Sequence, residues 1–357
     1  MQTPQIYHVI GLMSGSSLDG LDIAYCTFQK QNNKWSFSLL KAETIEYSSL
    51  WQSRLTQVTN SSALQFIETE IELTEFWAEN ILHFITSNQI KNIDFIASHG
   101  HTIFHQPNKK YSTQIVNGAA LAALTKLPVV CDFRSTDVAL NGQGAPLVPL
   151  ADFILFDEFA ACLNLGGISN ISLTFENKKT AFDISACNQW LNHIAQLQGK
   201  PFDSNGEIAQ QGNCNIELMK LLNSFYFYQL QAPKSLSNKD CEDFYQKNIL
   251  PFAINNEDKM RTIVEHIAHQ INACLPNNIT NRKCLVTGGG AYNTCLINEL
   301  KKNEKWNFII PTNEIISFKE AIIFAFLGVL RWRNEINVLA EITGATKDSC
   351  SGAIYLY

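Results

Sequence analysis

The chain has 357 residues, of which 46% are hydrophobic and 17% charged, a composition typical of folded globular proteins. This length allows two domains, each large enough to bury its own core. A net charge of −6 without any Lys or Arg cluster argues against a nucleic-acid partner. The longest apolar run, 321–330, is about half as long as a membrane-spanning helix. Because residues 1–7 also lack the pattern of a signal peptide, the sequence predicts a soluble, cytoplasmic protein without a membrane partner.

Ten cysteines are spread along the chain, and no two have the spacing of a redox pair or a zinc finger. Several lie within apolar runs, for example Cys162 and Cys284. We therefore expect reduced cysteines in the hydrophobic core, as is usual in the cytosol.

The first part of the chain opens with a predicted hairpin, because residues 6–28 form two strand patterns joined by a turn rich in glycine and serine. Apolar residues at helical spacing then predict a long helix over 63–86, covered on two sides. The other elements expected here are a strand near 35–40, a short strand over 93–97 that ends at Ser98-His99-Gly100, a helix over 118–125 and a strand over 127–131.

The same order of elements restarts near residue 160. A glycine-turned hairpin over 160–175 is followed by a strand over 180–184 and a helix over 188–198. The repetition lies in topology rather than in sequence, and two copies of one α/β half would produce it. The later elements expected are helices over 258–275, 293–300 and 319–332, strands over 283–287 and 306–310, and a loop over 235–243. Alternating strands and helices predict an α/β protein with mixed sheets.

Three glycine-rich turns follow predicted strands. They are Gly15-Ser16-Ser17-Leu18-Asp19-Gly20-Leu21-Asp22, Gly166-Gly167 and Gly288-Gly289-Gly290. Without a Cβ, such turns let backbone N–H groups approach the oxygens of a nucleoside triphosphate closely. None matches the Walker or Rossmann pattern. A single glycine turn can be purely structural, but three in one α/β chain predict a phosphate-binding cleft built from hairpins.

Two acidic residues are candidates for chemistry. Asp183 ends an apolar strand just before Asn188 opens a helix, so it is either a base that deprotonates a hydroxyl or water, or a helix cap. Asp19 either holds water on a Mg²⁺ ion that bridges phosphates, or bonds to the backbone of its own turn.

Further polar residues follow strand ends or begin a helix. His99 belongs to a segment with three histidines, for which lining of a polar substrate cleft is favoured over metal binding. Arg134 either binds a carboxylate or phosphate, or pairs with Asp132 or Asp137. Glu320, at the start of its predicted helix, is either a first-turn charge or a cleft residue.

Taken in order, these segments resemble the anhydro-N-acetylmuramic acid kinase family. The resemblance is collinear over nearly the whole chain and is carried by Gly11 to Asp22, Ser98 to His105, Asp132-Phe133-Arg134, Gly142 to Pro149, Asn164 to Ile171, Phe182-Asp183, Pro233-Lys234-Ser235, Gly288 to Asn293, Glu320-Ala321 and Thr343-Gly344-Ala345.

The resemblance implies a two-lobed actin-like ATPase fold, that is, a duplicated ribonuclease H-like fold with mixed five-stranded sheets and the active site between the lobes. Residues 1–140 and 325–357 would form the first lobe and 141–324 the second. The implied reaction opens a 1,6-anhydro sugar with water and transfers the γ-phosphate of ATP to the freed O6, with Mg²⁺ as cofactor. The product is N-acetylmuramic acid 6-phosphate, formed during cell-wall recycling. The resemblance also suggests a homodimer.

By the same resemblance, Asp183 activates the water, and the glycine turns bind ATP. His99, Arg134, Asn188 and Glu320 would contact the sugar, and no metal ligand is assigned. The chain departs from the usual family pattern at Ile184 to Cys187, which replaces a glycine-rich segment, and at Ser317-Phe318. Because these departures lie beside the substrate, a related kinase for a different amino sugar is one alternative. A non-catalytic nucleotide-binding protein of the actin fold is the other.

Overall fold

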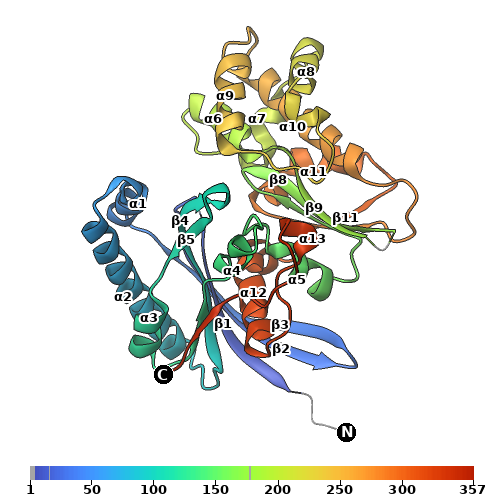
Figure 1. Ribbon diagram of the computed structural model, residues 1–357. Coiled ribbons are helices and arrows are strands. Elements are labelled where there is room, and N and C mark those ends of the chain that lie inside the picture. The colour runs from blue at the N-terminus through green and yellow to red at the C-terminus, as the bar shows by residue number, and fades with distance from the viewer. Residues whose placement is uncertain (1–4, 16, 177) are drawn as a thin grey trace. The chain divides into compact units, whose positions relative to one another are not determined.

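The chain is divided into two compact units (Figure 1). The computed structural model describes residues 5–15, 17–176 and 178–357. Unit 1 contains the residues up to Leu155 together with Phe318–Tyr357, and unit 2 is Phe156–Ser317. The boundaries expected from the sequence, after residues 140 and 324, both fall inside unit 1.

A buried ion pair connects the two sequence segments of unit 1. Helix α5 (Val148–Leu155) follows residue 140. The carboxylate of its Asp152 lies 2.8 Å from the ammonium group of Lys319, and both side chains are buried. Loss of either partner would leave a buried charge uncompensated, so the pair joins α5 to residues 318–324 within unit 1.

A mixed sheet of seven strands forms the centre of unit 1. Its strands are β1 (Ile6–Ser14), β2 (Gly20–Gln31), β3 (Lys34–Glu46), β4 (Phe95–Gln106), β5 (Tyr111–Ile115), β6 (Val129–Cys131) and β12 (Ala353–Tyr355). They follow the order β12-β6-β4-β1-β2-β3, with β5 paired to β4. The opening hairpin is confirmed. The predicted end of the fourth strand near residue 100 is wrong, because β5 pairs with residues 101–106 and prolongs β4.

Helices cover both faces of this sheet. They are α1 (Ser49–Gln57), α2 (Ala63–Ser87), α3 (Gly118–Thr125), α4 (Ser135–Ala139), α5, α12 (Asn313–Trp332), which belongs to unit 1 from Phe318 onward, and α13 (Ala340–Thr343). In Figure 1, α2 and α3 lie on one face and α12 on the other. A Cβ at Gly11 in β1 would lie only 2.0 Å from the carbonyl oxygen of Ala321. Glycine at this position therefore lets α12 pack directly on β1.

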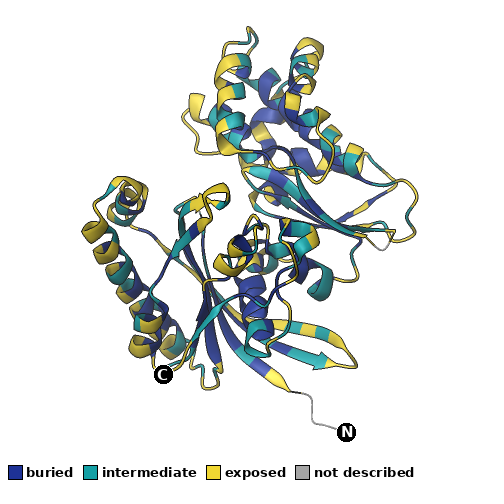
Figure 2. Cartoon of the chain, viewed as in Figure 1, coloured by how far each residue is buried: buried dark blue, intermediate teal, exposed yellow. Residues whose placement is uncertain are grey.

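Helix α2 is confirmed, but its second apolar side is covered only in part. Ser62 begins it with a capping box. The buried side includes Trp77 and Phe84, which are at most 1% exposed. On the other side, Leu64 is 67% and Ile67 is 56% exposed, so the expectation of two covered sides is wrong for this part of the helix (Figure 2).

The sheet of unit 2 repeats the central pattern of unit 1. Its five strands are β7 (Ala161–Leu165), β8 (Ile168–Phe175), β9 (Lys178–Ala186), β10 (Lys283–Thr287) and β11 (Asn307–Ile309), in the order β11-β10-β7-β8-β9. In both units the first three strands are antiparallel, and the next two strands of this path run parallel to the first. The duplicated α/β half is thus confirmed. The expected five strands are present in unit 2, whereas unit 1 adds β5 and β12.

Helices of unit 2 pack on its sheet in one hydrophobic core. They are α6 (Asn188–Leu197), α7 (Glu207–Gln211), α8 (Ile216–Asn223), α9 (Asn238–Phe244), α10 (Asn256–Cys274) and α11 (Thr294–Lys301). Helix α9 replaces most of the loop predicted over 235–243. The Ser237 side chain accepts the N–H of Asp240 at 3.0 Å, and this cap with an acid in the first turn starts a helix in a polar segment.

Among the helices of the described residues, none has both the length and the apolar character that crossing a bilayer requires. All ten cysteines are free thiols, and seven of them are buried.

Candidate active site

The turn between β1 and β2 is the first predicted phosphate loop. Met13 is the last residue of β1 that pairs with β2, and its partner is Asp22, so the turn lies between these two residues. The N–H of Leu18 donates to the carbonyl of Gly15 at 3.3 Å, and Leu18 has a left-handed backbone with a φ of 60°. Ser16 lies outside the described residues. The loop stands at the carboxyl end of β1, which is where sheets of this kind bind ligands.

A buried chain of hydrogen bonds holds Ser14, the residue before this turn. Nε1 of Trp77 donates to the hydroxyl of Tyr47 at 3.1 Å, and that hydroxyl lies 2.9 Å from Oγ of Ser14. Oγ of Ser14 lies a further 2.9 Å from Nδ1 of His101. Desolvation lowers the pKa of His101 to about 4, so its neutral ring can accept the Ser14 proton. Since all four side chains are buried, the chain fixes the start of the turn.

Two carboxylates flank the end of the turn. Asp19 is exposed, whereas Asp22 is half-buried and accepts a 2.6 Å hydrogen bond from the hydroxyl of Thr44. Desolvation raises the pKa of Asp22, and the charge of Asp19 adds to this effect. Within the described residues, no group of three or more His, Cys, Asp or Glu could hold a metal ion. The two carboxylates fit a Mg²⁺ ion that is held mainly by phosphates and water.

The structural reason for a glycine differs between positions of the three glycine turns. Gly288 has a φ of +81°, and its Cβ would lie 2.6 Å from Oδ1 of Asn164, so the fold itself requires glycine there. Gly167, in contrast, has no heavy atom of the described residues within 4 Å of the place of a Cβ, apart from its chain neighbours, and at Gly15 and Gly289 the nearest such atom is 3.6 Å away. Neither packing nor a positive φ explains these three glycines. Open space beside the backbone fits a ligand such as a phosphate that approaches closely.

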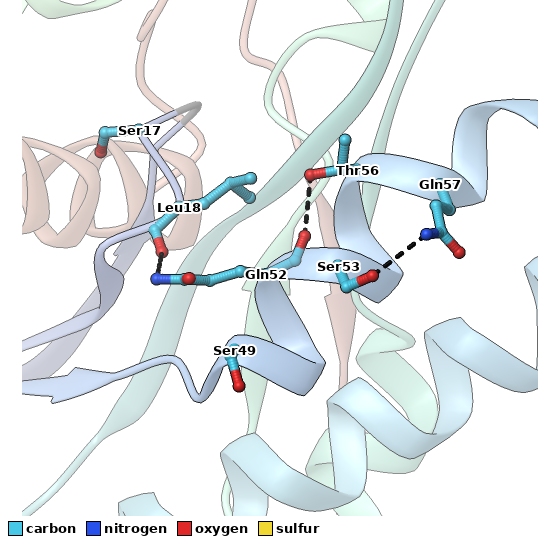
Figure 3. A pocket seen from close by; sticks show the side chains of 7 residues that line it. All are labelled: Ser17, Leu18, Ser49, Gln52, Ser53, Thr56 and Gln57. Atoms are coloured by element: carbon cyan, nitrogen blue, oxygen red, sulfur yellow. Dashed lines mark hydrogen bonds between the residues drawn. The ribbon is translucent and has the colours of Figure 1, made fainter.

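A pocket of about 450 Å³ adjoins the turn (Figure 3). It is formed by Ser17 and Leu18 of the turn and by hydroxyl and amide side chains of α1. The amide of Gln52 donates to the carbonyl of Leu18 at 3.3 Å and thereby connects α1 to the turn. Among the described residues that line it, none carries a charge, so these residues offer the pocket neutral hydrogen-bonding groups.

Arg134 follows β6, and its guanidinium group is held by other parts of unit 1. Nε and Nη2 donate to Nε2 of His99 at 3.0 and 2.8 Å, and Nη1 donates to the carbonyl of Gly144 at 2.6 Å. Within the described part of the chain, neither Asp132 nor Asp137 forms an ion pair with it. Desolvation lowers the pKa of Arg134 to about 10, so the group stays charged at neutral pH.

Glu320 lies well inside α12, because this helix begins at Asn313. The explanation as a first-turn charge is therefore wrong. Glu320 is exposed to solvent, and yet desolvation by surrounding protein raises its pKa, against the opposing charges of Lys319 and Arg134.

Unit 1 thus gathers one set of predicted residues at one edge of its sheet. Ser14 is the register partner of His101 on β4, and His99 holds Arg134. Glu320 follows on the helix that packs on β1, close enough to Arg134 for their charges to interact.

In unit 2, the other two glycine loops lie side by side, because β7 and β10 are parallel neighbours. Asn188 contacts both loops. Its amide donates to the carbonyl of Leu165 at 2.9 Å, and a Cβ on Gly289 or Gly290 would lie within 3.6 Å of it. Its backbone N–H donates to the carbonyl of Gly166 at 3.1 Å. Asn188 therefore shapes the loops, and its contact with a sugar remains a prediction.

Asp183 lies within β9, and one of its carboxylate oxygens is held by a neighbouring loop. Oδ2 accepts hydrogen bonds from the hydroxyl of Ser235 at 3.1 Å and from the N–H of Leu236 at 2.8 Å. Oδ1 has no such partner among the described residues. Asp183 does not cap the next helix, whose N-cap is Cys187. Desolvation raises the pKa of Asp183 and the two hydrogen bonds oppose the rise, so Oδ1 is a suitable proton acceptor.

Three residues hold predicted functional residues in place within their own units, and sequence patterns did not assign them that role. Ser235 holds Asp183, and its only signal was membership of the Pro233-Lys234-Ser235 motif. Asp137 anchors the loop that holds Arg134, and it had been considered only as an ion-pair partner. Tyr47 supports Ser14 from the end of β3, and no pattern in the sequence pointed to it.

Two copies of one strand order, each with a glycine turn after its first strand, define the chain as an α/β protein of the actin-like ATPase and sugar-kinase class. Among solved structures, component A of (R)-2-hydroxyglutaryl-CoA dehydratase from Acidaminococcus fermentans is 10% identical, with a TM-score of 0.46, covering 89% of this chain and 96% of that one. Glycerol kinase from Plasmodium falciparum with ADP is 8% identical, with a TM-score of 0.44, covering 98% and 94%. The fold class follows from the strand orders and not from these similarities.

The family model for anhydro-N-acetylmuramic acid kinase matches residues 7–357. Curated relatives of that name are similar along their full length. The protein of Sulfurimonas denitrificans is 31% identical, covering 97% of this chain and 98% of the relative. That of Haemophilus influenzae is 32% identical, covering 99% and 98%. The chain belongs to the anhydro-N-acetylmuramic acid kinase family.

Proposed function

We propose that this chain is an ATP-dependent kinase that converts 1,6-anhydro-N-acetylmuramic acid, ATP and water to N-acetylmuramic acid 6-phosphate and ADP in peptidoglycan recycling. The match to the family over residues 7–357 supports the substrate. The single structural observation that carries the mechanism is Asp183, which has one anchored oxygen, one free oxygen and a raised pKa. A cytoplasmic location and a homodimer belong to the same proposal.

In this mechanism Asp183 is the general base. Its Oδ1 takes one proton from a water molecule while the water oxygen bonds to the anomeric carbon. The bond from that carbon to O6 breaks, and O6 bonds to the γ-phosphorus of ATP. The bond from this phosphorus to the β-phosphate oxygen breaks, and ADP leaves. The second proton of the water remains on the new anomeric hydroxyl.

The other predicted residues bind and orient the substrates. Arg134 and Glu320 contact the sugar, and the open glycines Gly15, Gly167 and Gly289 let the backbone approach ATP. Asp19 and Asp22 would hold a Mg²⁺ ion directly or through water, and a bound ion would supply charge neutralisation at the phosphates. Phosphoryl transfer depends mainly on such positioning and charge stabilisation.

The test is an assay of purified protein with Mg-ATP and 1,6-anhydro-N-acetylmuramic acid. We expect ADP release that requires the sugar, and a sugar phosphate of the expected mass. Phosphorylation of another amino sugar in its place would contradict the substrate. ATP consumption that no tested sugar stimulates would contradict the kinase function altogether.

Ser235 tests the environment of the base. In the Ser235→Ala variant, Asp183 loses a hydrogen bond that stabilises its charged form, so its pKa rises further. The base is active as the carboxylate. We therefore expect the acid limb of kcat/KM against pH to move to higher pH, with activity lost on the acid side of the profile and recovered as the pH rises past the shifted limb.

The matched control is Ser224→Ala. Ser224 is an exposed serine of the same unit, and its hydroxyl donates to the carbonyl of Leu221 at 2.6 Å. Its profile should coincide with that of the wild type. An acid limb that stays in place in Ser235→Ala, or moves to lower pH, would show that this hydroxyl does not act on the base.

A further inference from the structure

We propose that His99 is a positioning residue, which orients the guanidinium group of Arg134 toward the acceptor sugar and does not touch the sugar itself. The inference rests on the proposed function, because it concerns the sugar side of the same site. It changes the role expected for His99 from a ligand contact to a support for another residue.

The contacts of His99 determine which ring nitrogen carries the proton. Nδ1 lies 2.9 Å from the carbonyl oxygen of Gly100, which can only accept, so Nδ1 is protonated and donates. Nε2 then accepts from Nε and Nη2 of Arg134. His99 is 3% exposed, and its ring centre lies 4.4 Å from that of Phe324. Both nitrogens are thus used within the protein, and neither remains for a ligand.

The ring must be neutral to hold Arg134. A second proton, on Nε2, would point directly at two N–H groups of the guanidinium. Desolvation, followed by the charge of Arg134, lowers the pKa of His99 well below its usual value. The acceptor is therefore available throughout the neutral range, and the arrangement is a permanent support.

A second support fixes the other side of the guanidinium group. Nη1 donates to the carbonyl of Gly144, and the N–H of Gly144 donates to Oδ2 of Asp137 at 2.7 Å. The hydroxyl of Thr343 donates to Oδ1 of the same carboxylate, also at 2.7 Å. Asp137 is completely buried. The loop that carries Gly144 is therefore held in place by the buried carboxylate of Asp137.

These contacts leave part of Arg134 for a ligand. A guanidinium group has five N–H donors, of which three are used by His99 and Gly144. The two remaining N–H groups, one on Nη1 and one on Nη2, lie in the plane of the guanidinium group. Such a planar pair suits two neighbouring oxygen atoms of a substrate. Glu320 provides an acceptor nearby, so a sugar hydroxyl can be bound as a donor in the same region.

Substitution of His99 by phenylalanine and by glutamine tests the role. Phenylalanine keeps the ring beside Phe324 but removes the acceptor, whereas the amide oxygen of glutamine can reach the place of Nε2. For His99→Phe we expect the KM of the sugar to rise about tenfold, the KM of ATP to change less than about twofold, and kcat to fall little. His99→Gln should recover most of the loss.

His83→Phe is the control, since His83 is exposed on α2. If His99→Phe does not fold, His99→Asn replaces it, because its shorter amide cannot reach Arg134. In an Arg134→Ala background, removing the acceptor at His99 should have no further effect on the KM of the sugar.

An unchanged sugar KM in His99→Phe, or equal losses in the Phe and Gln variants, would overturn the positioning role. A wild-type protein without sugar-dependent turnover would instead contradict the proposed function, and the positioning role would fail with it.

Discussion

Replacement of Asp183 by asparagine is expected to abolish sugar phosphorylation and to leave ATP affinity nearly unchanged. Asparagine can still accept the hydrogen bonds from Ser235 and Leu236, but it cannot take a proton from water. Loss of a general base lowers kcat by about 10²- to 10⁴-fold. Single-turnover assays of sugar phosphate and a separate titration of ATP binding would measure the two effects.

The same substitution should not destabilise the protein. In the folded state the pKa of Asp183 is raised by desolvation, so the charged carboxylate disfavours folding at any pH above that pKa. Asparagine removes this penalty, and we expect a Tm equal to or above that of the wild type at pH 7. Asp243→Asn, on the exposed surface of the same unit, should leave activity unchanged. Turnover by Asp183→Asn at the wild-type rate would remove Asp183 from the mechanism.

Replacement of Asp137 by alanine is expected to destabilise unit 1 strongly. The change removes a buried carboxylate and leaves the N–H of Gly144 and the hydroxyl of Thr343 without this acceptor. Each buried group left unsatisfied costs about 1–3 kcal/mol, so for the two groups we expect the free energy of unfolding to fall by about 2–6 kcal/mol. Urea unfolding at pH 7 would measure the loss. The KM of the sugar should also rise, because Gly144 no longer holds Arg134.

Two control variants separate this effect from a simple loss of charge. Asp137→Asn keeps an acceptor for Gly144, and its amide can donate to Thr343, whose hydroxyl already lies 3.3 Å from the carbonyl of Leu339. It should therefore lose much less stability than the alanine variant. Glu75→Ala, at an exposed position on α2, should change stability by less than about 0.5 kcal/mol. If Asp137→Ala were as stable as Glu75→Ala, the carboxylate would not anchor this loop.

Local patterns predicted most of the strands and helices. The hairpins at Ile6–Gln31 and Ala161–Phe175 followed from glycine turns between apolar runs. Helix α2 followed from its spacing. Local patterns were insufficient where pairing at a distance decided the structure. β4 continues past residue 100 only because β5 is available to pair with it.

The sequence also could not show which apolar face of a helix is covered. In α2 both faces carry large apolar residues, but only the face with Trp77 meets the sheet, while Leu64 remains exposed. The apolar pattern predicts a start of α12 at residue 319, but the helix begins at Asn313. Glu320 therefore lies in the interior of the helix and not at its end. Lys319 also lies within this helix and pairs with Asp152.

The order of residues along the chain was sufficient to determine the α/β class, the duplicated half and the glycine turns, because each depends on neighbours within a few positions. The resemblance of its motifs added the family and named Asp183. Only the tertiary structure decided how the polar side chains are used. Ser235 reaches Asp183 over 52 positions of sequence, and Thr343 reaches Asp137 over 206. Hydrogen-bond partners so far apart are selected by the packing of the sheet and its loops, and no local pattern contains that information.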